Sequence, residues 1–431
     1  MDNVYDEFTW RGMVYDDTEG ARDLLAREKV TAYIGFDPTA PSLHVGTMLP
    51  IMALARLQRF GHTPIAIVGG STGLIGDPAG KSQERVLLSR EEVSNNLEGI
   101  RRQLERFLDF DSAVNRAHIV NNADWLDELS LMDFLRDIGK HFTVNYMLAK
   151  ESVKRRLGSD DGISFTEFSY LMLQAYDFLT LYDRYGCRLQ LGGSDQWGNI
   201  VAGCDLIRKF RGAQAFGLVL PLVTTAAGTK FGKTEAGTVW LDPTRTSPYQ
   251  FYQFWLNVDD RDAVAYLKYF TFLTQEEILQ LERATAQAPE TREAQRTLAR
   301  EVTALVHGVE GVQAAERGST VLFDRNLTQL PVQAILAVTE DVPSSVLYDD
   351  ELRGEGLPLV DVLSSTGVTS SKSEATRLIR SGGIYLNNER VDNERTRLTL
   401  DDAIGGELFL IRRGQKQNFL IRIVKKAVGD T

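Results

Sequence analysis

Three polar residues recur at helical spacing within the otherwise apolar stretch Phe165–Tyr185. Tyr170, Gln174 and Asp177 occupy positions i, i+4 and i+7, so a helix would place all three on one face. Solvent-facing stripes usually carry Lys and Glu, whereas Tyr, Gln and Asp are short or rigid hydrogen-bonding groups suited to a small polar ligand. We expect Asp177 to accept a hydrogen bond from a phenol or hydroxyl, and Asp77 and Gln174 to hold an ammonium group. A solvent-facing stripe is the alternative.

Two lysines flank a glycine further along the chain, in the loop that carries Lys230, Gly232 and Lys233. Two ammonium groups at this spacing can close over a polyphosphate and neutralise charge as it develops in the transition state. The chain shows no Ser/His/Asp set, no Cys nucleophile with a partner and no pair of catalytic carboxylates. The pattern favours electrostatic catalysis and positioning over covalent or acid–base chemistry. An ordinary charged surface loop is the alternative.

Two further segments have the character of phosphate-binding turns. His44 and Gly46 lie where a β-prone segment, 30–36, passes through an Asp-Pro turn into a helix, and such a unit points free backbone N–H groups at an anion. The second apolar strand, 62–68, ends in Gly69–Lys81, whose five glycines allow positive φ and close approach of a ligand. A plain βα connection and a flexible loop are the respective alternatives.

Alternating strands and helices must position these residues. We expect strands at 30–36, 62–68, 117–120, 187–191 and 218–223, and helices at 47–60, 90–108, 165–185 and 200–210, with many helix formers between 131 and 157. This alternation predicts an α/β fold with a doubly wound, mostly parallel, Rossmann-like sheet, whose ligands lie at the carboxyl ends of the strands. The candidate loops all follow strands, which is consistent with one shared site.

The remainder of the chain divides by pattern into further segments. We expect a catalytic domain at 1–245, an all-α domain at 246–327, a connecting segment at 328–355 and a small α+β module at 356–431. Helices at 275–287 and 292–307 are the clearest elements of the all-α domain.

Composition excludes several classes of protein. The net charge of −11 argues against non-specific nucleic-acid binding over the whole surface. The two cysteines, Cys187 and Cys204, have no partners at metal-ligand spacing, so no disulfide framework and no protein-bound metal site are expected. No apolar run reaches the length of a membrane span or a signal peptide. We therefore expect a soluble, cytoplasmic protein.

The ordered motifs resemble those of the bacterial tyrosyl-tRNA synthetases, a family of class I enzymes, along nearly the whole chain. The matching segments are 35–39, 44–46, 68–81, 165–170, 174–178, 192–199 and 230–234. We refer to 44–47 as the first signature and to 230–234 as the second. Each motif alone is weak, but their order and spacing together are specific.

The resemblance implies a two-step reaction in which L-tyrosine and Mg-ATP give tyrosyl-adenylate and pyrophosphate, and the tyrosyl group then passes to the 3′ end of tRNA(Tyr). Mg²⁺ enters with ATP. It also implies a homodimer, an anticodon-binding role for the all-α domain and an S4-type RNA-binding module at the C-terminal end. No stretch remains for an editing domain.

Roles for individual residues also follow from the resemblance. Tyrosine would be bound by Tyr33 and Asp177 at the phenol, by Asp77, Tyr170 and Gln174 at the ammonium group, and by Gln196 near the carboxylate. ATP and pyrophosphate would be met by Thr39, His44, Gly46, Lys230, Lys233 and Thr234, and the adenosine and ribose by Asp37, Gly193 and Asp195. Thr47 replaces the second histidine usual in the first signature, and its hydroxyl could still reach a ribose or phosphate oxygen.

Three functional classes stay open at this level. The favoured class is the tRNA ligase. A second is another nucleotidyl-transferring enzyme of the superfamily that attaches no tRNA, which the S4-like module disfavours. A third is an RNA-binding protein descended from a synthetase that has lost catalysis, suggested by Thr47 and disfavoured by Lys230, Lys233, Asp177 and Gln196. Pyrophosphate exchange dependent on tyrosine and ATP separates the three.

Overall fold

The computed structural model describes residues 3–79, 88–158, 162–229, 231–234, 237–323, 327, 331–339, 342–414 and 417–425. Its internal contacts form two units, residues 1–246 with 254–306, and residues 247–253 with 307–431. No helix among the described residues is long and apolar enough to cross a membrane.

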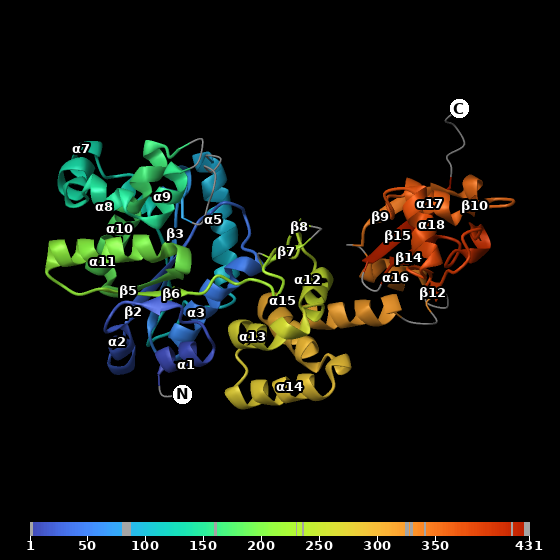
Figure 1. The fold of residues 1–431 in the computed structure, drawn as a ribbon, viewed down its shortest axis with the longest axis horizontal. Coiled ribbons are helices and arrows are strands. Elements are labelled where there is room, and N and C mark those ends of the chain that lie inside the picture. The colour runs from blue at the N-terminus through green and yellow to red at the C-terminus, as the bar shows by residue number, and fades with distance from the viewer. Residues whose placement is uncertain are drawn as a thin grey trace. The chain divides into compact units, whose positions relative to one another are not determined.

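The first unit is built on a six-stranded sheet (Figure 1). In spatial order the strands are β1 (Asp16–Asp17), β6 (Phe216–Leu220), β5 (Cys187–Gly193), β2 (Thr31–Phe36), β3 (Thr63–Val68) and β4 (His118–Asn121). All neighbouring pairs are parallel except β1 with β6. This arrangement confirms the predicted doubly wound, mostly parallel sheet. The strand order reverses between β2 and β5, which is where ligands of such sheets bind.

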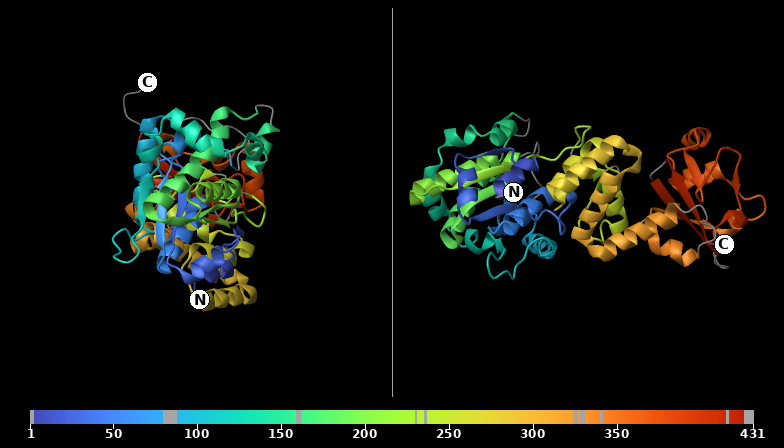
Figure 2. Two further views of the ribbon diagram at one scale, coloured as in Figure 1. Left: turned by 90° about the vertical axis from the view of Figure 1, so that its left-hand side faces the viewer. Right: turned by 90° about the horizontal axis from the view of Figure 1, so that it is seen from below.

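Helices cover both faces of this sheet (Figures 1 and 2). Side chains of α10 (Phe165–Tyr185) and α11 (Trp197–Arg211) pack against one face, where Tyr33 and Ile65 join Phe178 in one buried cluster. Helix α3 (Met48–Arg59) packs against β2 and β3 from the other side. The side chains of successive strand residues point to opposite faces, so Tyr33 faces α10 while its neighbour Ile34 faces away.

Local sequence signals set the ends of α10. Its N-cap, Ser164, accepts a hydrogen bond from the backbone N–H of Glu167, and its C-terminal Gly186 takes the left-handed conformation with φ 61°. The helix therefore runs without a break, as expected, and holds Tyr170, Gln174 and Asp177 on one rigid element.

Further elements of the first unit precede residue 246. They are α1 (Val4–Trp10), α2 (Ala21–Arg27), α4 (Thr72–Ile75), α5 (Arg90–Leu104), α6 (Ala123–Leu126), α7 (Leu131–Asp133), α8 (Val144–Leu148), α9 (Glu151–Leu157), and the hairpin of β7 (Lys233–Thr234) with β8 (Gly237–Thr238). The helix-rich stretch 131–157 is thus split into short helices. The strand expected at 218–223 lies at Phe216–Leu220 and ends before Pro221, which has no N–H to donate to the sheet.

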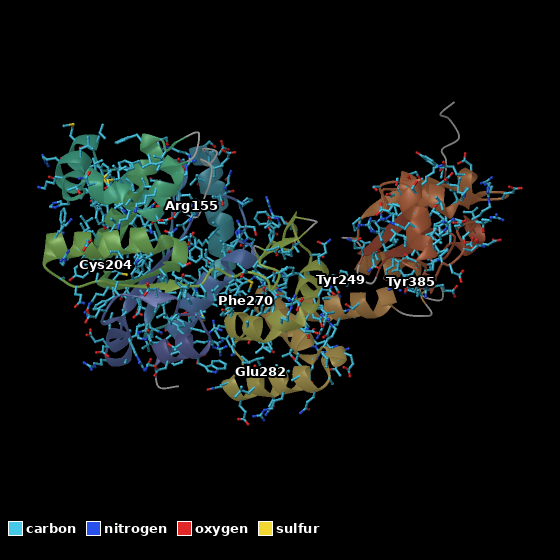
Figure 3. The ribbon with its side chains drawn as sticks, viewed as in Figure 1. Arg155, Cys204, Tyr249, Phe270, Glu282 and Tyr385 are labelled. Atoms are coloured by element: carbon cyan, nitrogen blue, oxygen red, sulfur yellow. The ribbon has the colours of Figure 1, made fainter. Side chains whose placement is uncertain are left out.

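The region expected to be all-α is helical. It holds α12 (Pro248–Leu256), α13 (Asp260–Phe270), α14 (Gln275–Gln287) and α15 (Glu293–Phe323), the last interrupted at Gly308, which has φ 75° and ψ 176°. Phe270 and Glu282 are labelled on α13 and α14 in Figure 3.

The C-terminal part contains a five-stranded sheet in the order β12-β11-β14-β15-β9, with bounds β12 (Glu389–Arg390), β11 (Ile384–Leu386), β14 (Leu408–Arg413), β15 (Gln417–Val424) and β9 (Ser344–Tyr348). Its other elements are α16 (Val332–Val338), β10 (Leu357–Pro358), α17 (Leu359–Ser365), α18 (Lys372–Arg380) and β13 (Arg397–Leu398).

The segment 328–355, which we expect to connect two domains, contains α16 and β9, and β9 pairs in parallel with β15. Pro331 and Pro343 flank these elements and obscured them in the sequence. The domain boundaries given above stay a prediction.

Candidate active site

A pocket of about 150 Å³ lies at the carboxyl ends of β2, β3 and β5, at the point where the strand order reverses. Eight of the predicted site residues line it: Tyr33, Asp37, Asp77, Tyr170, Gln174, Asp177, Gly193 and Gln196. Pairing of Tyr33 in β2 with Gln190 in β5 sets these two side chains next to each other on one face of the sheet. The structure thus brings the tyrosine-binding residues proposed from the resemblance into one cavity.

Asp177 is held firmly at the buried end of this pocket. Its side chain is 4% exposed and accepts hydrogen bonds from Trp125 Nε1 at 2.8 Å and Asn122 Nδ2 at 3.0 Å. Burial raises the pKa of Asp177 to about 7, although both hydrogen bonds favour the charged form. A carboxylate with two fixed donors keeps its remaining lone pairs for a ligand hydroxyl.

The hydroxyl of Tyr33 is the second polar group at this end. Tyr33 is 1% exposed, and its hydroxyl has no hydrogen-bond partner among the residues that the structure describes. Burial, followed by the nearby charge of Asp177, raises the pKa of Tyr33 well above its usual value. A buried hydroxyl without a partner costs free energy. A ligand with its own hydroxyl at this depth would remove that cost.

Asp77, Gln174 and Gln196 line the pocket and form a hydrogen-bonded network with Asn199. Gln196 donates to Asp77 Oδ2 at 2.6 Å and accepts from Gln174 Nε2 at 3.2 Å, while Asn199 donates to Gln174 Oε1 at 2.9 Å. The backbone N–H of Ala79 binds the other oxygen of Asp77 at 2.9 Å. The oxygens in this network keep lone pairs that could also accept from an ammonium group.

The hydroxyl of Tyr170 donates to Asp37 Oδ1 at 3.4 Å. Tyr170 was assigned to the ammonium group and Asp37 to adenosine and ribose, so the structure joins residues from the two predicted subsites.

Two glycines after β3 are required by neighbouring side chains. A Cβ at Gly70 would lie 2.0 Å from Asn121 Oδ1, and one at Gly69 would lie 2.5 Å from Thr72 Oγ1. The glycine-rich character of 69–81 therefore serves packing between β3 and β4 as well as any ligand. Gly80 and Lys81 lie outside the described residues.

The first signature forms a short turn ahead of α3. The hydroxyl of Thr47 donates to the backbone oxygen of His44 at 2.7 Å and accepts from the backbone N–H of His44 at 3.2 Å. A Cβ at Gly46 would lie 2.9 Å from the His44 ring, which explains the glycine. We expected the Thr47 hydroxyl to reach a ligand oxygen, but a ligand would have to compete with these local bonds.

The second signature is attached to the first through backbone contacts. Val45 N–H donates to Val239 at 3.0 Å, and Val239 N–H donates to Gly232 at 3.2 Å. Gly232 has φ 84°, and a Cβ there would lie 2.8 Å from Val45 Cγ2. Lys230 lies outside the described residues, as do the side chains of Lys233 and Thr234, whose backbone forms β7. The described parts of the two signatures are thus neighbours, as a shared ATP site requires.

Thr39, His44, Gly46, Thr47 and Asp195 do not line the pocket. The backbone N–H of Thr39 donates to Asp37 at 2.9 Å in the turn after β2. A Cβ at Gly193 would lie 2.6 Å from Asp195 Oδ1, so these two residues form one tight turn after β5. Their predicted roles with ATP stay predictions.

Sequence reasoning missed several residues of the site. Asn122 and Trp125 orient Asp177, Thr72 accepts a hydrogen bond from Asn122 at 2.8 Å, and Gln190 lines the pocket with its Oε1 buried and without a partner among the described residues. Gln190 carried a signal, because a polar residue within an apolar buried strand needs a partner. The sequence signal for Asn122 and Trp125 was weaker, because it consisted only of their position soon after a strand.

Comparison with known proteins identifies the family. Residues 25–324 match the model of the class I tRNA synthetases (W and Y), and residues 334–421 match the SYY-like C-terminal domain of tyrosine–tRNA ligases. The chain belongs to the class I tRNA synthetase family. The resemblance inferred from the motifs is therefore confirmed.

Similar members of this family come from bacteria. The tyrosine–tRNA ligase of Roseiflexus castenholzii is 57% identical over 98% of this chain and 100% of its own length. That of Geobacillus stearothermophilus is 55% identical over 96% and 98%. Among solved structures, a C-terminally truncated mitochondrial tyrosyl-tRNA synthetase from Aspergillus nidulans is 32% identical, covers 75% of this chain and 95% of its own, and superposes with a TM-score of 0.67.

Proposed function

We propose that this class I synthetase is a tyrosine–tRNA ligase. It activates L-tyrosine with ATP: a carboxylate oxygen of tyrosine attacks the α-phosphorus, and pyrophosphate leaves. The 3′-terminal hydroxyl of tRNA(Tyr) then attacks the activated carbonyl, and AMP leaves. The buried pair of Tyr33, with its unpartnered hydroxyl, and Asp177 is the observation that carries this proposal.

The pair accounts for selection of tyrosine over phenylalanine. A tyrosine phenol would bind Tyr33 and Asp177, whereas phenylalanine would leave both polar groups buried and unpaired, which costs free energy. Tyrosyl-tRNA synthetases as a class discriminate between these two amino acids by about 10⁵ without editing.

The remaining roles follow the resemblance. Asp77, Tyr170 and Gln174 hold the ammonium group of tyrosine, and Gln196 lies near its carboxylate. Asp37, Gly193 and Asp195 contact adenosine and ribose, and Gly46 and Thr47 lie beside ATP. His44, Thr39, Lys230, Lys233 and Thr234 stabilise the transferring phosphate charge. Mg²⁺ arrives as Mg-ATP.

We further propose that tRNA(Tyr) is bound by helices within 246–327 and by the S4-like module at 356–431. The match of residues 334–421 to a tyrosine–tRNA ligase C-terminal domain supports the second part. The reaction needs ATP and tRNA, so the cytoplasm is the proposed location.

Aminoacylation tests the assigned reaction. The purified chain, ATP, Mg²⁺, labelled tyrosine and a tRNA(Tyr) transcript should yield labelled tRNA. A chain that forms adenylate but never charges the tRNA would instead be a nucleotidyl-transferring enzyme. A chain that binds the tRNA without forming adenylate would be a non-catalytic RNA-binding protein.

The raised pKa of Asp177 predicts a pH-dependent tyrosine affinity. Below about pH 7 its carboxyl is protonated and cannot act as a carboxylate acceptor for the phenol. Affinity should therefore rise as pH increases toward 7, by up to about tenfold per pH unit, and level off above it. Equilibrium dialysis between about pH 5.5 and 8.5 measures this. The Asp177→Asn variant should show no such slope, and an equal slope in that variant would assign it to another group.

Exposed apolar side chains support the proposed homodimer. Leu131 is 69% exposed, Met132 70% and Val144 60%, all within one short stretch of the first unit. Exposed apolar side chains are often covered by a protein partner when they lie close together. We expect the wild-type chain to sediment as a dimer and Met132→Asp to shift it toward monomer. The variant Val114→Asp, at an exposed apolar residue outside this stretch, is the control. A monomeric wild type would contradict the proposal.

A further inference from the structure

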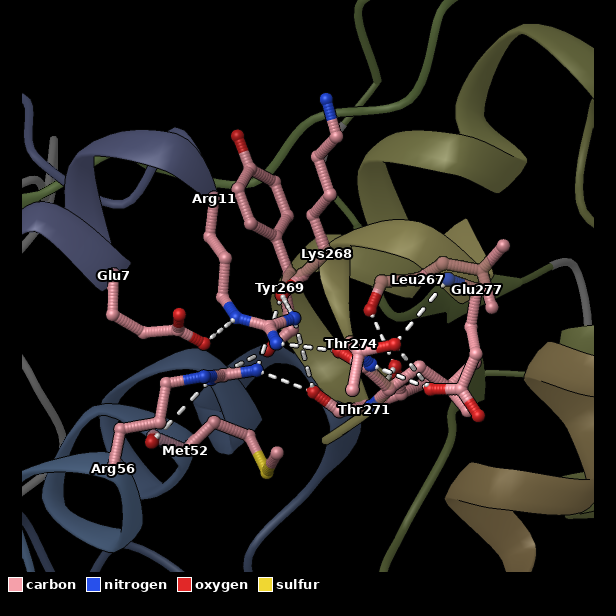
Figure 4. Close-up of polar contacts among 11 residues, drawn as sticks. Glu7, Arg11, Met52, Arg56, Leu267, Lys268, Tyr269, Thr271, Thr274 and Glu277 are labelled. Atoms are coloured by element: carbon pink, nitrogen blue, oxygen red, sulfur yellow. Dashed lines mark hydrogen bonds and ion pairs between the residues drawn. The ribbon is translucent and has the colours of Figure 1, made fainter. Parts of the chain in front are cut away.

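Two arginines are buried at the C-terminal end of α13, where they contact its backbone (Figure 4). Arg11, which follows α1, is 3% exposed, and Arg56, in the last turn of α3, is 1% exposed. Neither residue contributes to the pocket described above. Arginine is rarely buried to this degree unless its donors are satisfied.

Both guanidinium groups bind the backbone oxygens that end α13. Arg11 donates to Lys268 at 2.9 Å, Thr271 at 3.3 Å and Leu273 at 2.7 Å. Arg56 donates to Lys268 at 3.1 Å, Tyr269 at 3.0 Å and Thr271 at 2.5 Å. The last carbonyls of a helix lack partners within the helix and carry the negative end of its dipole. The two cations therefore fix both the position and the direction of this helix end.

Burying two guanidinium groups costs free energy, so stability of the fold alone does not explain them. One carboxylate, that of Glu7, pairs with Arg11, and Arg56 Nε has no partner among the described residues. Burial, followed by the charge of Arg11, lowers the pKa of Arg56 well below its usual value. Apolar residues of similar size often stabilise such a position as well or better. What the planar, five-donor fork of arginine supplies is defined geometry.

Helix α13, which the two arginines fix, packs against Phe231 of the second signature. We call the aromatic residues around Phe231 the aromatic socket; they are Tyr266 and Phe270 of α13 and Phe254 and Trp255 of α12. Phe231 is 4% exposed, stacks on Phe270 of α13 at a centroid distance of 5.4 Å with an interplanar angle of 12°, and meets Tyr266 edge-on at 4.8 Å. Phe254 and Trp255 of α12 complete the socket at 5.5 and 5.6 Å. Phe231 is followed directly by Gly232, which lies against Val45 of the first signature.

Helix α3 links the first signature to α13. It starts directly after the first signature, at Met48, and holds Arg56 in its last turn. Contacts between α3 and α13 therefore connect the two signatures by a second route, in addition to the backbone hydrogen bonds of Val45 and Val239.

We infer that Arg11 and Arg56 are positioning residues for adenylate formation, which act by fixing α13 and, through its aromatic socket, the placement of the second signature over ATP. This inference rests on the proposed function. Neither arginine lines the pocket.

The variant Arg56→Lys tests the inference. Lysine keeps the charge but replaces the fork by a single ammonium group that cannot reach the same three carbonyls. We expect kcat/KM for ATP in tyrosine-dependent pyrophosphate exchange to fall by roughly 10- to 100-fold, with an unchanged Kd for tyrosine. Phe231→Leu, which removes the socket contact, should give the same pattern, and the double variant should lose less than the product of the two single losses.

Arg156→Lys is the matched control. Arg156 is 2% exposed and pairs with Glu167 of α10 at 2.8 Å, so it anchors the helix of the tyrosine pocket and not α13. All rates are normalised to active sites by titration, which removes losses from misfolded protein. Three results would overturn the inference. Arg56→Lys could weaken tyrosine binding as much as it lowers kcat/KM for ATP, or it could change neither quantity. The third result is a double variant with Phe231→Leu whose loss equals the product of the two single losses. Absence of tyrosine-dependent exchange in the wild type would instead contradict the proposed function.

Discussion

The Asp177→Asn variant should lose roughly 100-fold in kcat/KM for tyrosine while KM for ATP stays unchanged. The carboxylate accepts from Trp125 and Asn122 at one time. An asparagine amide can keep the acceptor toward Trp125, but then its NH₂ group faces the NH₂ group of Asn122. The Asp177→Asn variant therefore loses both the hydrogen bond from Asn122 and the charged acceptor for the phenol. Steady-state pyrophosphate exchange with varied tyrosine and varied ATP measures both parameters.

Asp183→Asn provides the control on the same helix. Asp183 pairs with Arg211 at the surface and lies outside the pocket, and surface ion pairs contribute little. We expect no change in either substrate parameter. An Asp177→Asn variant that kept its tyrosine parameters would show that the phenol is bound elsewhere.

A second large effect is expected at the second signature. Lys233→Ala should slow tyrosine activation by about 10²- to 10³-fold, because it removes a cation that acts on charge developing in the transition state. Tyrosine affinity should stay the same, since Gly232, the preceding residue, lies against Val45 of the first signature, which does not line the pocket. Single-turnover adenylate formation and equilibrium dialysis of tyrosine separate the two quantities.

The variant Lys29→Ala tests whether the loss of any lysine slows tyrosine activation. The Lys29 side chain is exposed and bonds to the backbone of Val114, away from the pocket. Its activation rate should equal that of the wild type. A loss of tyrosine affinity in Lys233→Ala as large as its loss of rate would mean that the loop binds the ground state.

The sheet and the main site helix could be predicted because their signals are local. Apolar runs of strand length alternate with helices in the sequence, and Ser164 and Gly186 mark the two ends of α10. The polar face of this helix, with Gln174 and Asp177, follows from its period alone. The carboxyl-end rule for parallel sheets then brings Tyr33 and Asp77 to the same cavity.

The partners of these residues could not be predicted in the same way. Trp125 bonds to Asp177 from a different strand loop, and the Thr47 hydroxyl turns back to His44. Such choices depend on distances between elements that spacing along the chain does not fix. The same holds for β9, which is a strand only because β15 offers it an edge, and for the arginines at the end of α13.

The ratio of kcat/KM for tyrosine to that for phenylalanine tests the central claim most directly. Both amino acids are compared in ATP–pyrophosphate exchange with the same enzyme, using phenylalanine freed of traces of tyrosine. The buried pair of Tyr33 and Asp177 predicts a ratio of at least about 10⁴ for the wild type, with a marked fall in the Asp177→Asn variant. A wild-type ratio near one, or no exchange with tyrosine, would contradict a pocket built to bind the phenol.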